Sequence, residues 1–347
     1  MRNASSKSFT MRDVARLAGV SVGTVSAVLN KKSTVAAETM RRIEETISRL
    51  DYRPDTLARG LKTGRSHVVG FVVPDVTNPF FTEAMGGLEA MARSRGYSVI
   101  LSNSNEDPEQ ELQNLSLLYS RRVDGVVLAC SSGRVVYDRL TMRRFPIVFI
   151  DRLPPTGFPG RAVIVDNAGA SHAATNHLIG LGHVNIAIIA GRLDLSVGFE
   201  RLAGFRKAMQ EARIPIRESY LQEGDFHPES GYQCGMKLMA LPEPPTAIFA
   251  CNNSMTLGLM RALAECQAPC PERVSVLAFD DFPWAAHFRP QMTAVAQPVF
   301  ELGRQAMRTL LAAMEPESQE AMEIKDPLLI LKAELRVRQS TAPPPAR

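Results

Sequence analysis

Hydrophobic residues recur every three or four positions over the first fifty residues, which is the spacing of one buried face of a helix. The pattern predicts three helices, at residues 11–18, 22–30 and 36–50. Gly19 ends the first helix, and only a short turn separates it from the second. Two helices joined by a tight, glycine-containing turn are typical of the helix-turn-helix unit, whose second helix lies in the DNA major groove.

The ends and buried faces of these helices are also predicted by the pattern. Thr10 and Ser21 stand where a side-chain oxygen can cap the first and second helix. The inward positions are Val14, Leu17, Ala18, Val25, Val28, Leu29, Met40, Ile43 and Ile47. Charged residues occupy the outer face of the third helix. The region is therefore expected to fold as a small helical unit with one core.

After residue 65 the pattern changes to short apolar runs that alternate with stretches of helix length. Strands are expected at 67–73, 97–102, 123–129, 146–150, 162–165, 186–190, 247–250, 274–278 and 292–295. Such alternation is typical of parallel, doubly wound sheets, and some 270 residues are enough for two of them. No G-x-G-x-x-G follows a strand, so a dinucleotide-binding fingerprint is lacking.

Composition separates the same two regions. The chain has 347 residues and a net charge of +4, but residues 1–65 hold 13 lysines and arginines against 6 acidic residues. The first region therefore carries +7 and the remainder −3. A small basic unit on a slightly acidic body is typical of a nucleic-acid-binding module joined to another domain, although charge alone is equally compatible with a solvated basic face.

Several classes of protein are disfavoured. No apolar run approaches 18 residues, and residues 1–10 lack the apolar segment of a secretory signal, so we expect a cytoplasmic protein without membrane spans. The five cysteines form no C-x-x-C pair, and the six histidines show no metal-binding spacing. Residues 19–23 match G-x-S-x-G, but a helix precedes this motif where a hydrolase needs a strand. We expect no enzyme, no cofactor and no metal.

Two stretches of the first region resemble one family closely. The sequence D-V-A-R-L-A-G-V-S-V-G-T-V-S-A-V-L-N begins at residue 13, and L-D-Y-R-P-D-T-L-A-R-G-L-K-T-G-R-S begins at residue 50. They resemble the DNA-binding head of lactose-repressor (LacI/GalR-type) transcription regulators. The resemblance implies a DNA-binding domain at 1–53 and a hinge helix or linker at 54–65. A three-helix unit without affinity for DNA is the alternative.

The resemblance also implies the residues that contact DNA. In the family, the positions of Val22, Gly23 and Ala27 contact base edges, and those of Ser21, Thr24, Ser26 and Asn30 mostly hold phosphates. Thr10 belongs to the same DNA-binding set. Many relatives carry Arg where Ala27 stands, so an arginine contact to guanine is lost and an altered operator is expected. Alternatively, Val22, Gly23 and Ala27 are plain helix surface.

The hinge segment resembles one that folds on DNA and inserts a leucine into the central minor-groove step. Leu61 occupies the position of that leucine, and Ala58 lies one turn before it. An apolar wedge of this kind unstacks a base step and kinks the duplex. Asp55 stands where many relatives have Asn, which is expected to weaken DNA binding slightly or to cap the hinge helix. The alternative is that Leu61 packs on the body.

The body resembles the effector-binding core of the same family along nearly its whole length. Among the similar segments are V-V-P-D-V-T-N-P-F-F, P-I-V-F-I-D-R, E-R-L-A-G-F-R-K-A-M and S-V-L-A-F-D-D. That core is similar to periplasmic sugar-binding proteins, in which two lobes close on a ligand. The resemblance implies a core at 66–340 with a disordered tail at 341–347. The N-terminal lobe is expected at 66–163 and 296–325, and the C-terminal lobe at 164–295 and 326–338.

Candidate effector-binding residues follow the strands, where side chains of both lobes converge. Carried over by position, they are Asn78, Phe80, Phe81, Asp151, Phe199, Phe226, Asn252 and Asp280. Carboxylates and amides bind hydroxyls, and aromatic rings stack on a sugar or a base. The alternatives are lobe core for the two neighbouring phenylalanines, helix caps for the aspartates and a turn for Asn252.

Two positions depart from the family pattern. Phe199 stands where an arginine often holds the ligand, which suggests a neutral effector unless Arg152 or Arg192 compensates. Asn253 stands where the segment A-N-D normally places Asp. The identity of the effector is therefore not readable from the sequence.

We therefore expect an all-α helix-turn-helix head on an α/β, periplasmic-binding-protein-like core of two doubly wound lobes. The expected function is that of a homodimeric regulator, a repressor like most of the family, which binds a pseudo-palindromic double-stranded DNA operator under control of a small molecule such as a sugar. Residues 339–347 contain no leucine heptads of the kind that would favour a tetramer. The rival is a small-molecule-binding protein whose head has lost its affinity for DNA.

Overall fold

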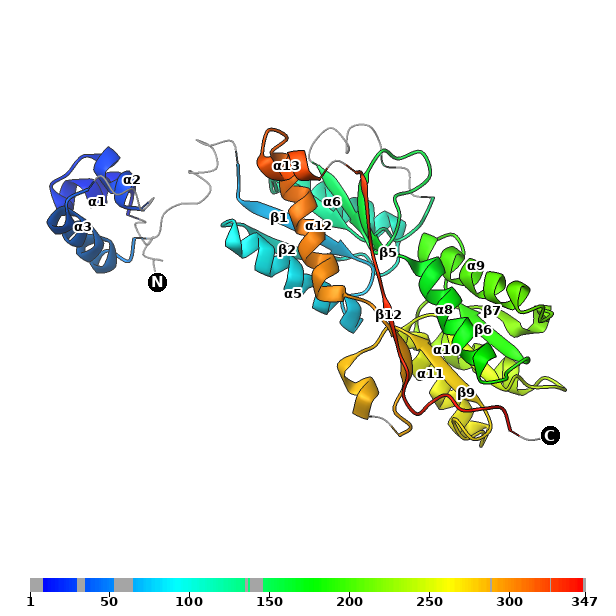
Figure 1. The fold of residues 1–347 in the computed structure, drawn as a ribbon. Coiled ribbons are helices and arrows are strands. Elements are labelled where there is room, and N and C mark those ends of the chain that lie inside the picture. Colours follow the sequence, from blue (N-terminus) through cyan, green and yellow to red (C-terminus); the bar gives the residue numbers. More distant parts are fainter. Residues whose placement is uncertain are drawn as a thin grey trace, which may run out of the picture. The chain divides into compact units, whose positions relative to one another are not determined.

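The computed structural model describes residues 9–29, 35–52, 65–134, 137, 146–287, 289–324 and 326–345. The chain divides into two compact units, Met1–Ser66 and His67–Arg347 (Figure 1). Each unit is described by itself below.

The first unit consists of three short helices around a small core. The helices are α1 (Met11–Ala18), α2 (Val22–Leu29) and α3 (Ala37–Arg49), which confirms the three predicted elements. Thr10 caps α1 as expected: its hydroxyl accepts from the Asp13 amide, and the Asp13 carboxylate accepts from the Thr10 amide at 2.9 Å. Gly19 ends α1 with a φ of 66°, which glycine adopts without strain.

One predicted core residue of α1 lies elsewhere. Leu17 is 46% exposed, whereas Val14, Ala15 and Ala18 are buried, together with Ile43 and others, in the core between the helices. The physical reason is that α1 packs against both α2 and α3. Its buried face is therefore centred between Val14, Ala15 and Ala18, and Leu17 falls outside it.

The second unit contains two six-stranded sheets, each flanked by helices (Figure 1). The first sheet has the order β11-β5-β4-β3-β1-β2, and all of its strand pairs are parallel. Its strands are β1 (Val68–Val73), β2 (Ser98–Asn103), β3 (Gly125–Leu128), β4 (Ile147–Ile150), β5 (Arg161–Val165) and β11 (Leu328–Leu331). Its helices are α5 (Pro79–Ser94), α6 (Pro108–Ser120), α12 (Val299–Met314) and the short α13 (Gln319–Glu323).

The two faces of this sheet carry different helices because successive strand residues point to opposite sides. Val69, Phe71 and Val73 share a core cluster with residues of α5 and α12. Val72 belongs to a different cluster, which includes residues of α6. The alternating direction of the buried side chains along β1 therefore places α5 and α12 on one face and α6 on the other.

The second sheet has the order β12-β10-β9-β8-β6-β7, in which only the pair of β10 and β12 is antiparallel among those described. Its strands are β6 (Ile186–Ala190), β7 (Leu221–Glu223), β8 (Ala247–Ala250), β9 (Ser275–Phe279), β10 (Thr293–Ala296) and β12 (Glu334–Arg336). Its helices are α8 (Asn167–Gly180), α9 (Ser196–Glu211), α10 (Pro228–Met239) and α11 (Asn253–Glu265). Single-turn helices span Glu218–Tyr220 and Pro283–His287.

All nine strands expected from the apolar runs are present, with small shifts at their ends, but the last strands divide differently between the lobes. The segment 326–338 was expected in the C-terminal lobe. Instead β11 pairs with β5 in the first sheet, and only β12 joins the second. The apolar run of β11 covers the open edge of β5, whose backbone groups would otherwise lack partners.

The expectation of a disordered tail from residue 341 is also wrong for the first of these residues. The hydroxyl of Thr341 lies 3.0 Å from Nε2 of His177, and the carbonyl of Ala342 accepts from His183 at 2.8 Å. Both residues extend the chain along the C-terminal lobe. Their backbone and side-chain hydrogen bonds hold them against it.

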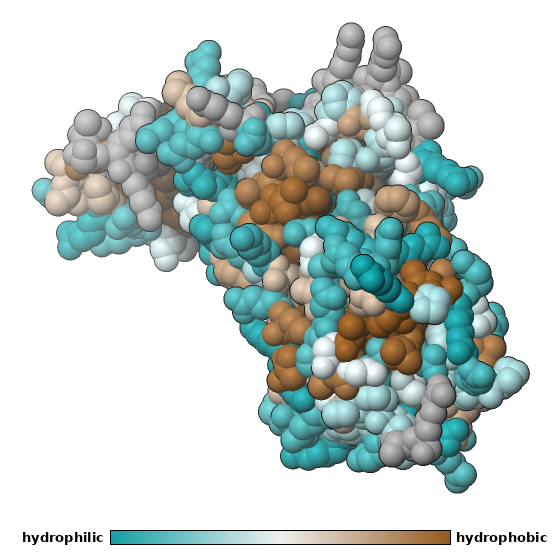
Figure 2. All heavy atoms as spheres, turned by 45° about the vertical axis from the view of Figure 1, so that its right-hand side comes forward, coloured by the Kyte–Doolittle hydropathy of each residue, from teal (hydrophilic) through white to brown (hydrophobic). Residues whose placement is uncertain are grey.

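Hydrophobic side chains reach the surface of the second unit in several patches (Figure 2). Large hydrophobic residues that remain exposed include Ile100 and Leu101 on the edge strand β2, Leu117 on α6 and Phe300 on α12. Contiguous exposed apolar surface is typical of contacts with other proteins. Among the described residues, no helix combines the length and hydropathy needed to cross a bilayer.

Candidate functional site

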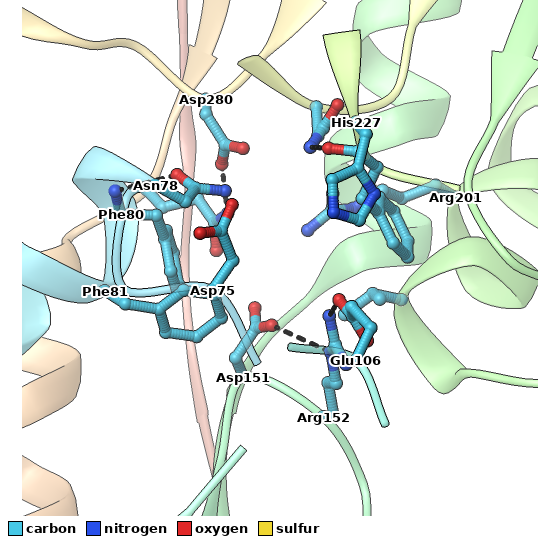
Figure 3. Close-up of a pocket in the computed structure, with 14 residues that line it drawn as sticks. Asp75, Asn78, Phe80, Phe81, Glu106, Asp151, Arg152, Arg201, His227 and Asp280 are labelled. Atoms are coloured by element: carbon cyan, nitrogen blue, oxygen red, sulfur yellow. Dashed lines mark hydrogen bonds and ion pairs between the residues drawn. The ribbon is translucent and has the colours of Figure 1, made fainter. Parts of the chain in front are cut away.

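A pocket lies between the two lobes of the second unit, where loops after the strands of both sheets meet. Its space measures about 440 Å³, including its opening to solvent. In Figure 3, Phe80 and Phe81 stand on one side, Arg201 and His227 on the opposite side, and Asp151 and Asp280 toward its two ends. The lining residues are Asp75, Asn78, Phe80, Phe81, Glu106, Asp151, Arg152, Val197, Arg201, Phe226, His227, Asn252, Asp280 and Gln297.

Seven of the eight residues proposed from the sequence as effector-binding line this pocket. The exception is Phe199, which is 63% exposed on α9 and is not part of the lining. Two positions further along the same helix, Arg201 is only 3% exposed and faces the pocket. Since a helix turns by about 100° per residue, side chains two positions apart point in nearly opposite directions. The structure therefore corrects the assignment of Phe199.

Seven residues that line the pocket were not among the candidates proposed from the sequence. They are Asp75, Glu106, Arg152, Val197, Arg201, His227 and Gln297. Four of them, Asp75, Glu106, Arg152 and Gln297, follow strands closely, so the end-of-strand argument applied more widely would have found them. Arg152 was considered only as a substitute for a missing arginine. Arg201 lies within a helix, in the segment E-R-L-A-G-F-R-K-A-M, whose resemblance to the family could have drawn attention to it.

The aromatic residues approach from both lobes. Phe80 and Phe81 begin α5, and their rings meet edge to face with centroids 5.0 Å apart. The preceding residue, Asn78, caps this helix by accepting the Phe80 amide at 3.0 Å, and Pro79 occupies the first helical position. Phe226 comes from the loop before α10, and the guanidinium of Arg152 lies 5.6 Å from the centre of its ring. The pocket thus offers aromatic surface from the two lobes.

Two buried aspartates supply acceptors. Burial raises the pKa of Asp151 to about 6, although the nearby cations Arg152 and Arg201 oppose the shift. Burial also raises the pKa of Asp280, and Arg201 and a hydrogen bond from Gln297 at 2.6 Å oppose that shift. The other side-chain atom of Gln297, Oε1, is buried and has no partner among the described residues. It is therefore an acceptor available to a ligand.

Two buried guanidinium groups are held by the protein itself. Arg152 binds both oxygens of Glu106, at 2.9 and 2.6 Å, and donates to the carbonyl of Cys130. Arg201 donates from Nε to Asn167 and from Nη1 to the carbonyl of Cys251, and its guanidinium stacks 3.7 Å from the ring centre of Phe279. Because these groups are fixed in advance, they present donors with little freedom to reorient.

Asn252 serves mainly to position its neighbours. Its Oδ1 caps α11 by accepting the Met255 amide at 2.8 Å, and its Nδ2 donates to the carbonyl of Phe226 at 2.9 Å. Asn252 thus lines the pocket, as expected, and it caps a helix where the alternative was a turn. Its amide holds the loop that carries Phe226.

Polar contacts join the two lobes directly around the pocket. They are Ser132 to Asp194 at 3.0 Å, Arg192 to the carbonyl of Ser131 at 2.9 Å, the Leu153 amide to Ser196 at 2.9 Å, and Asn253 to Asn78 at 2.9 Å. The pocket is thus enclosed by a closed arrangement of the lobes. Rings, buried carboxylates, amides and fixed cations together can bind a small polyhydroxylated molecule.

The first unit presents a different kind of surface at the start of α2. Ser21, Val22 and Gly23 are exposed, Val22 by 42%. Ser21 caps the helix, since its hydroxyl accepts the Thr24 amide at 3.1 Å, and it also pairs with the Thr24 hydroxyl at 2.8 Å. A Cβ at Gly23 would meet only the Ser21 hydroxyl, at 3.5 Å. The fold of the head therefore does not require glycine at this position. Because Gly23 has no side chain, another molecule can approach the backbone of α2 closely there.

The remaining candidate DNA-binding residues differ in their exposure. Ser26 and Ala27 are half-buried on α2, and Thr10 is exposed at the start of α1. Asn30, Asp55, Ala58 and Leu61 lie outside the described residues.

Comparison with known proteins covers both units. Residues 10–55 match the model of bacterial regulatory proteins of the lacI family, and residues 175–341 match a periplasmic binding protein-like domain. The chain is 38% identical over 307 residues to the HTH-type transcriptional repressor PurR of Haemophilus influenzae (strain PittEE), which is 87% of this chain and 90% of that protein. It is 37% identical over 304 residues to the ribose operon repressor of Escherichia coli (strain K12), which is 87% of this chain and 92% of that protein.

Solved structures agree with these relatives. The lac repressor dimer bound to operator and the anti-inducer ONPF matches with a TM-score of 0.84 at 27% identity, covering 97% of this chain and all of that one. A LacI family transcriptional regulator from Enterococcus faecium with bound ribose matches with a TM-score of 0.69 at 29% identity. That match covers 80% of this chain and 99% of the other.

Proposed function

Because the chain belongs to the LacI family of bacterial regulatory proteins and is a DNA-binding regulator modulated by a small molecule, we propose that its effector is an unphosphorylated monosaccharide bound between the lobes. The carrying observation is the composition of the pocket. Aromatic rings from both lobes and the buried carboxylates of Asp151 and Asp280 face one small space. Rings pack on the C–H face of a sugar, and carboxylates accept its hydroxyls.

The charges of the pocket favour a neutral ligand. Arg152 is already paired with Glu106, and the single positive charge of Arg201 acts on the two buried carboxylates of Asp151 and Asp280. The carboxylates of Asp151 and Asp280 would repel a phosphate group. Ribose is the first candidate, because a solved relative contains it and a sequence relative is a ribose operon repressor.

Isothermal titration calorimetry of the full chain with D-ribose tests the proposal. We expect one sugar per chain, with D-ribose 5-phosphate bound at least about tenfold more weakly because of the two carboxylates. Phe199→Ala, which lies outside the pocket, is the matched control and should bind like the original protein. Absence of binding to D-ribose and to other neutral pentoses and hexoses would contradict the proposal.

For the head we propose recognition of a pseudo-palindromic operator by a homodimer, with α2 in the major groove and the segment 54–65 as hinge. The start of α2 is exposed and carries no acidic side chain. Val22 and Ala27 suit contact with thymine methyl groups, and Leu61 is proposed as the minor-groove wedge. The protein would act in the cytoplasm, without enzymatic activity, as a repressor.

Selection of bound fragments from genomic DNA, at two salt concentrations, tests this part. We expect a pseudo-palindromic motif with a deformable central step, bound by a dimer in sedimentation. Fragments without a motif that bind only at low salt would indicate non-specific electrostatic association instead.

A further inference from the structure

Asn253, at the start of α11 in the C-terminal lobe, contacts the N-terminal lobe across the edge of the pocket. Its Nδ2 donates to Oδ1 of Asn78 at 2.9 Å. Asn253 is 3% exposed but does not belong to the lining of the pocket. It lies instead in an adjoining crevice with Phe80 and Glu83 of the other lobe. Its side chain therefore acts between the lobes without reaching the ligand space.

The orientation of both amides follows from their remaining partners. Oδ1 of Asn78 must be the oxygen, because it accepts the backbone amide of Phe80 at the start of α5. Oδ1 of Asn253 must also be the oxygen, because it accepts the backbone amide of Ser254 at 2.7 Å. Only the nitrogen of Asn253 is then left to face Asn78. The contact is a donor meeting an acceptor, and Nδ2 of Asn78 stays available to the pocket.

A carboxylate at this position would reverse the interaction. An aspartate has no donor, so two oxygens would meet where the lobes now bond. The surroundings are already acidic, with Glu83 on α5 and Asp280 and Asp281 after β9. Arg336 and Arg338 pair with Asp281, at 2.8 and 2.7 Å, whereas Arg336 acts on Glu83, and Arg201 on Asp280, through charge alone. The backbone amide of Asn253 also donates to Asp280, a lining residue.

We propose that Asn253 is a positioning residue: it holds the lobes closed beside the pocket and fixes the amide of Asn78 so that its nitrogen faces the effector. The departure from the aspartate normal in this family then has a physical reason in this chain. The inference rests on the proposed sugar-binding function only for the measurement of D-ribose affinity described below.

Hydrogen exchange of the full chain without ligand, read on peptides that cover residues 78–84 and 252–256, tests the contact itself. Asn253→Ala should raise exchange of these peptides several-fold, and Asn253→Asp should raise it by about tenfold near pH 8, since repulsion adds to the lost bond. Asn176→Asp makes the same chemical change on the exposed side of α8 in the same lobe and should leave these peptides unchanged.

A pH series distinguishes positioning from general damage. Burial beside Glu83 and Asp280 should raise the pKa of the introduced aspartate above its ordinary value of about 4, and once protonated it can donate to Asn78. The excess exchange of Asn253→Asp over the original protein should therefore shrink between about pH 8 and about pH 5, whereas that of Asn253→Ala should not. The neighbouring groups Glu83, Asp280, Asp281, Arg201, Arg336 and Arg338 are present in all variants, so ratios to the original protein remove the part of the pH dependence that does not involve the introduced carboxylate. The D-ribose affinity ratio should follow the same order and the same pH trend.

Exchange in Asn253→Asp equal to that of the original protein at both pH values would overturn the inference. So would equal exchange in Asn253→Asp and Asn253→Ala at every pH. If the original protein binds no D-ribose, the effector assignment fails, while the exchange comparison still decides the role of Asn253. Thermal unfolding of each variant shows that it is folded.

Discussion

The helical head and the interlobe pocket differ in how they hold their functional groups. In the head, the candidate DNA-contacting residues at the start of α2, Ser21, Val22 and Gly23, are exposed, and Ser21 is held by a hydrogen bond with its near neighbour Thr24. In the pocket, two arginines and two aspartates are buried, and the arginines are held by residues far away in sequence, Arg152 by Glu106 and Arg201 by Asn167. A local site tolerates change with small energies, whereas a buried network couples every change to its partners.

The largest effect is expected for Asp280→Ala. The variant removes a buried acceptor and leaves Nε2 of Gln297 without its partner. D-ribose affinity should fall by about 100-fold in calorimetry, because hydrogen bonds to charged groups are the stronger ones. Operator binding without sugar should remain. Unchanged sugar affinity would mean that the pocket is not the effector site.

The next effect concerns Asp151, whose pKa burial raises to about 6. A carboxyl group whose pKa is higher in the folded than in the unfolded chain favours folding when protonated. Its penalty is therefore present above pH 6 and relieved as the pH falls from 6 toward 4. Asp151→Asn should raise the free energy of unfolding near pH 7 by about 2 kcal/mol and flatten its pH dependence in this range, measured by denaturant titration.

Sugar binding should change in the opposite direction. The ionised carboxylate is the better acceptor, so D-ribose affinity of the original protein should fall below pH 6, whereas Asp151→Asn should bind weakly at every pH. A variant that is neither more stable nor weaker in binding would show that Asp151 is not a functional group held at the expense of stability.

Leu61→Ala tests the hinge. Loss of the proposed wedge should weaken specific operator binding by about tenfold in a fluorescence anisotropy titration, because the kinked duplex loses its apolar contact. D-ribose affinity should stay the same, since the residue belongs to a separate unit from the pocket. Equal operator affinity in the variant would remove Leu61 from the DNA-binding set.

The smallest effect is expected for Gly23→Ala, in the helical head. Gly23→Ala should stabilise the head by about 0.5–1 kcal/mol, because alanine is the better helix former and its Cβ meets only the Ser21 hydroxyl at 3.5 Å. Operator affinity should nevertheless fall, since the added methyl group lies on the exposed surface of α2. Unaltered affinity would favour the interpretation of Gly23 as plain helix surface.

The pattern of hydrophobic residues predicted the helices and strands themselves better than it predicted how they pack. The three helices and nine strands could be predicted because each rests on its own hydrophobic periodicity and on caps such as Thr10 and Gly19. The sheet that β11 joins could not, because an apolar run carries no record of its neighbour in a sheet. Leu17 and Phe199 were misplaced for a related reason: which face of a helix is buried depends on the elements that pack against it.

For this protein, the sequence alone determined the family, the two-part architecture and half of the residues that line the pocket, since short motifs and strand ends are properties of neighbouring residues. Only the tertiary structure decided that Arg201 faces the ligand space in place of Phe199, that Glu106 neutralises Arg152, and that Asn253 meets Asn78. These pairs lie on separate segments that come together only when both sheets are packed. Their chemistry depends on distance in space, which spacing along the chain does not encode.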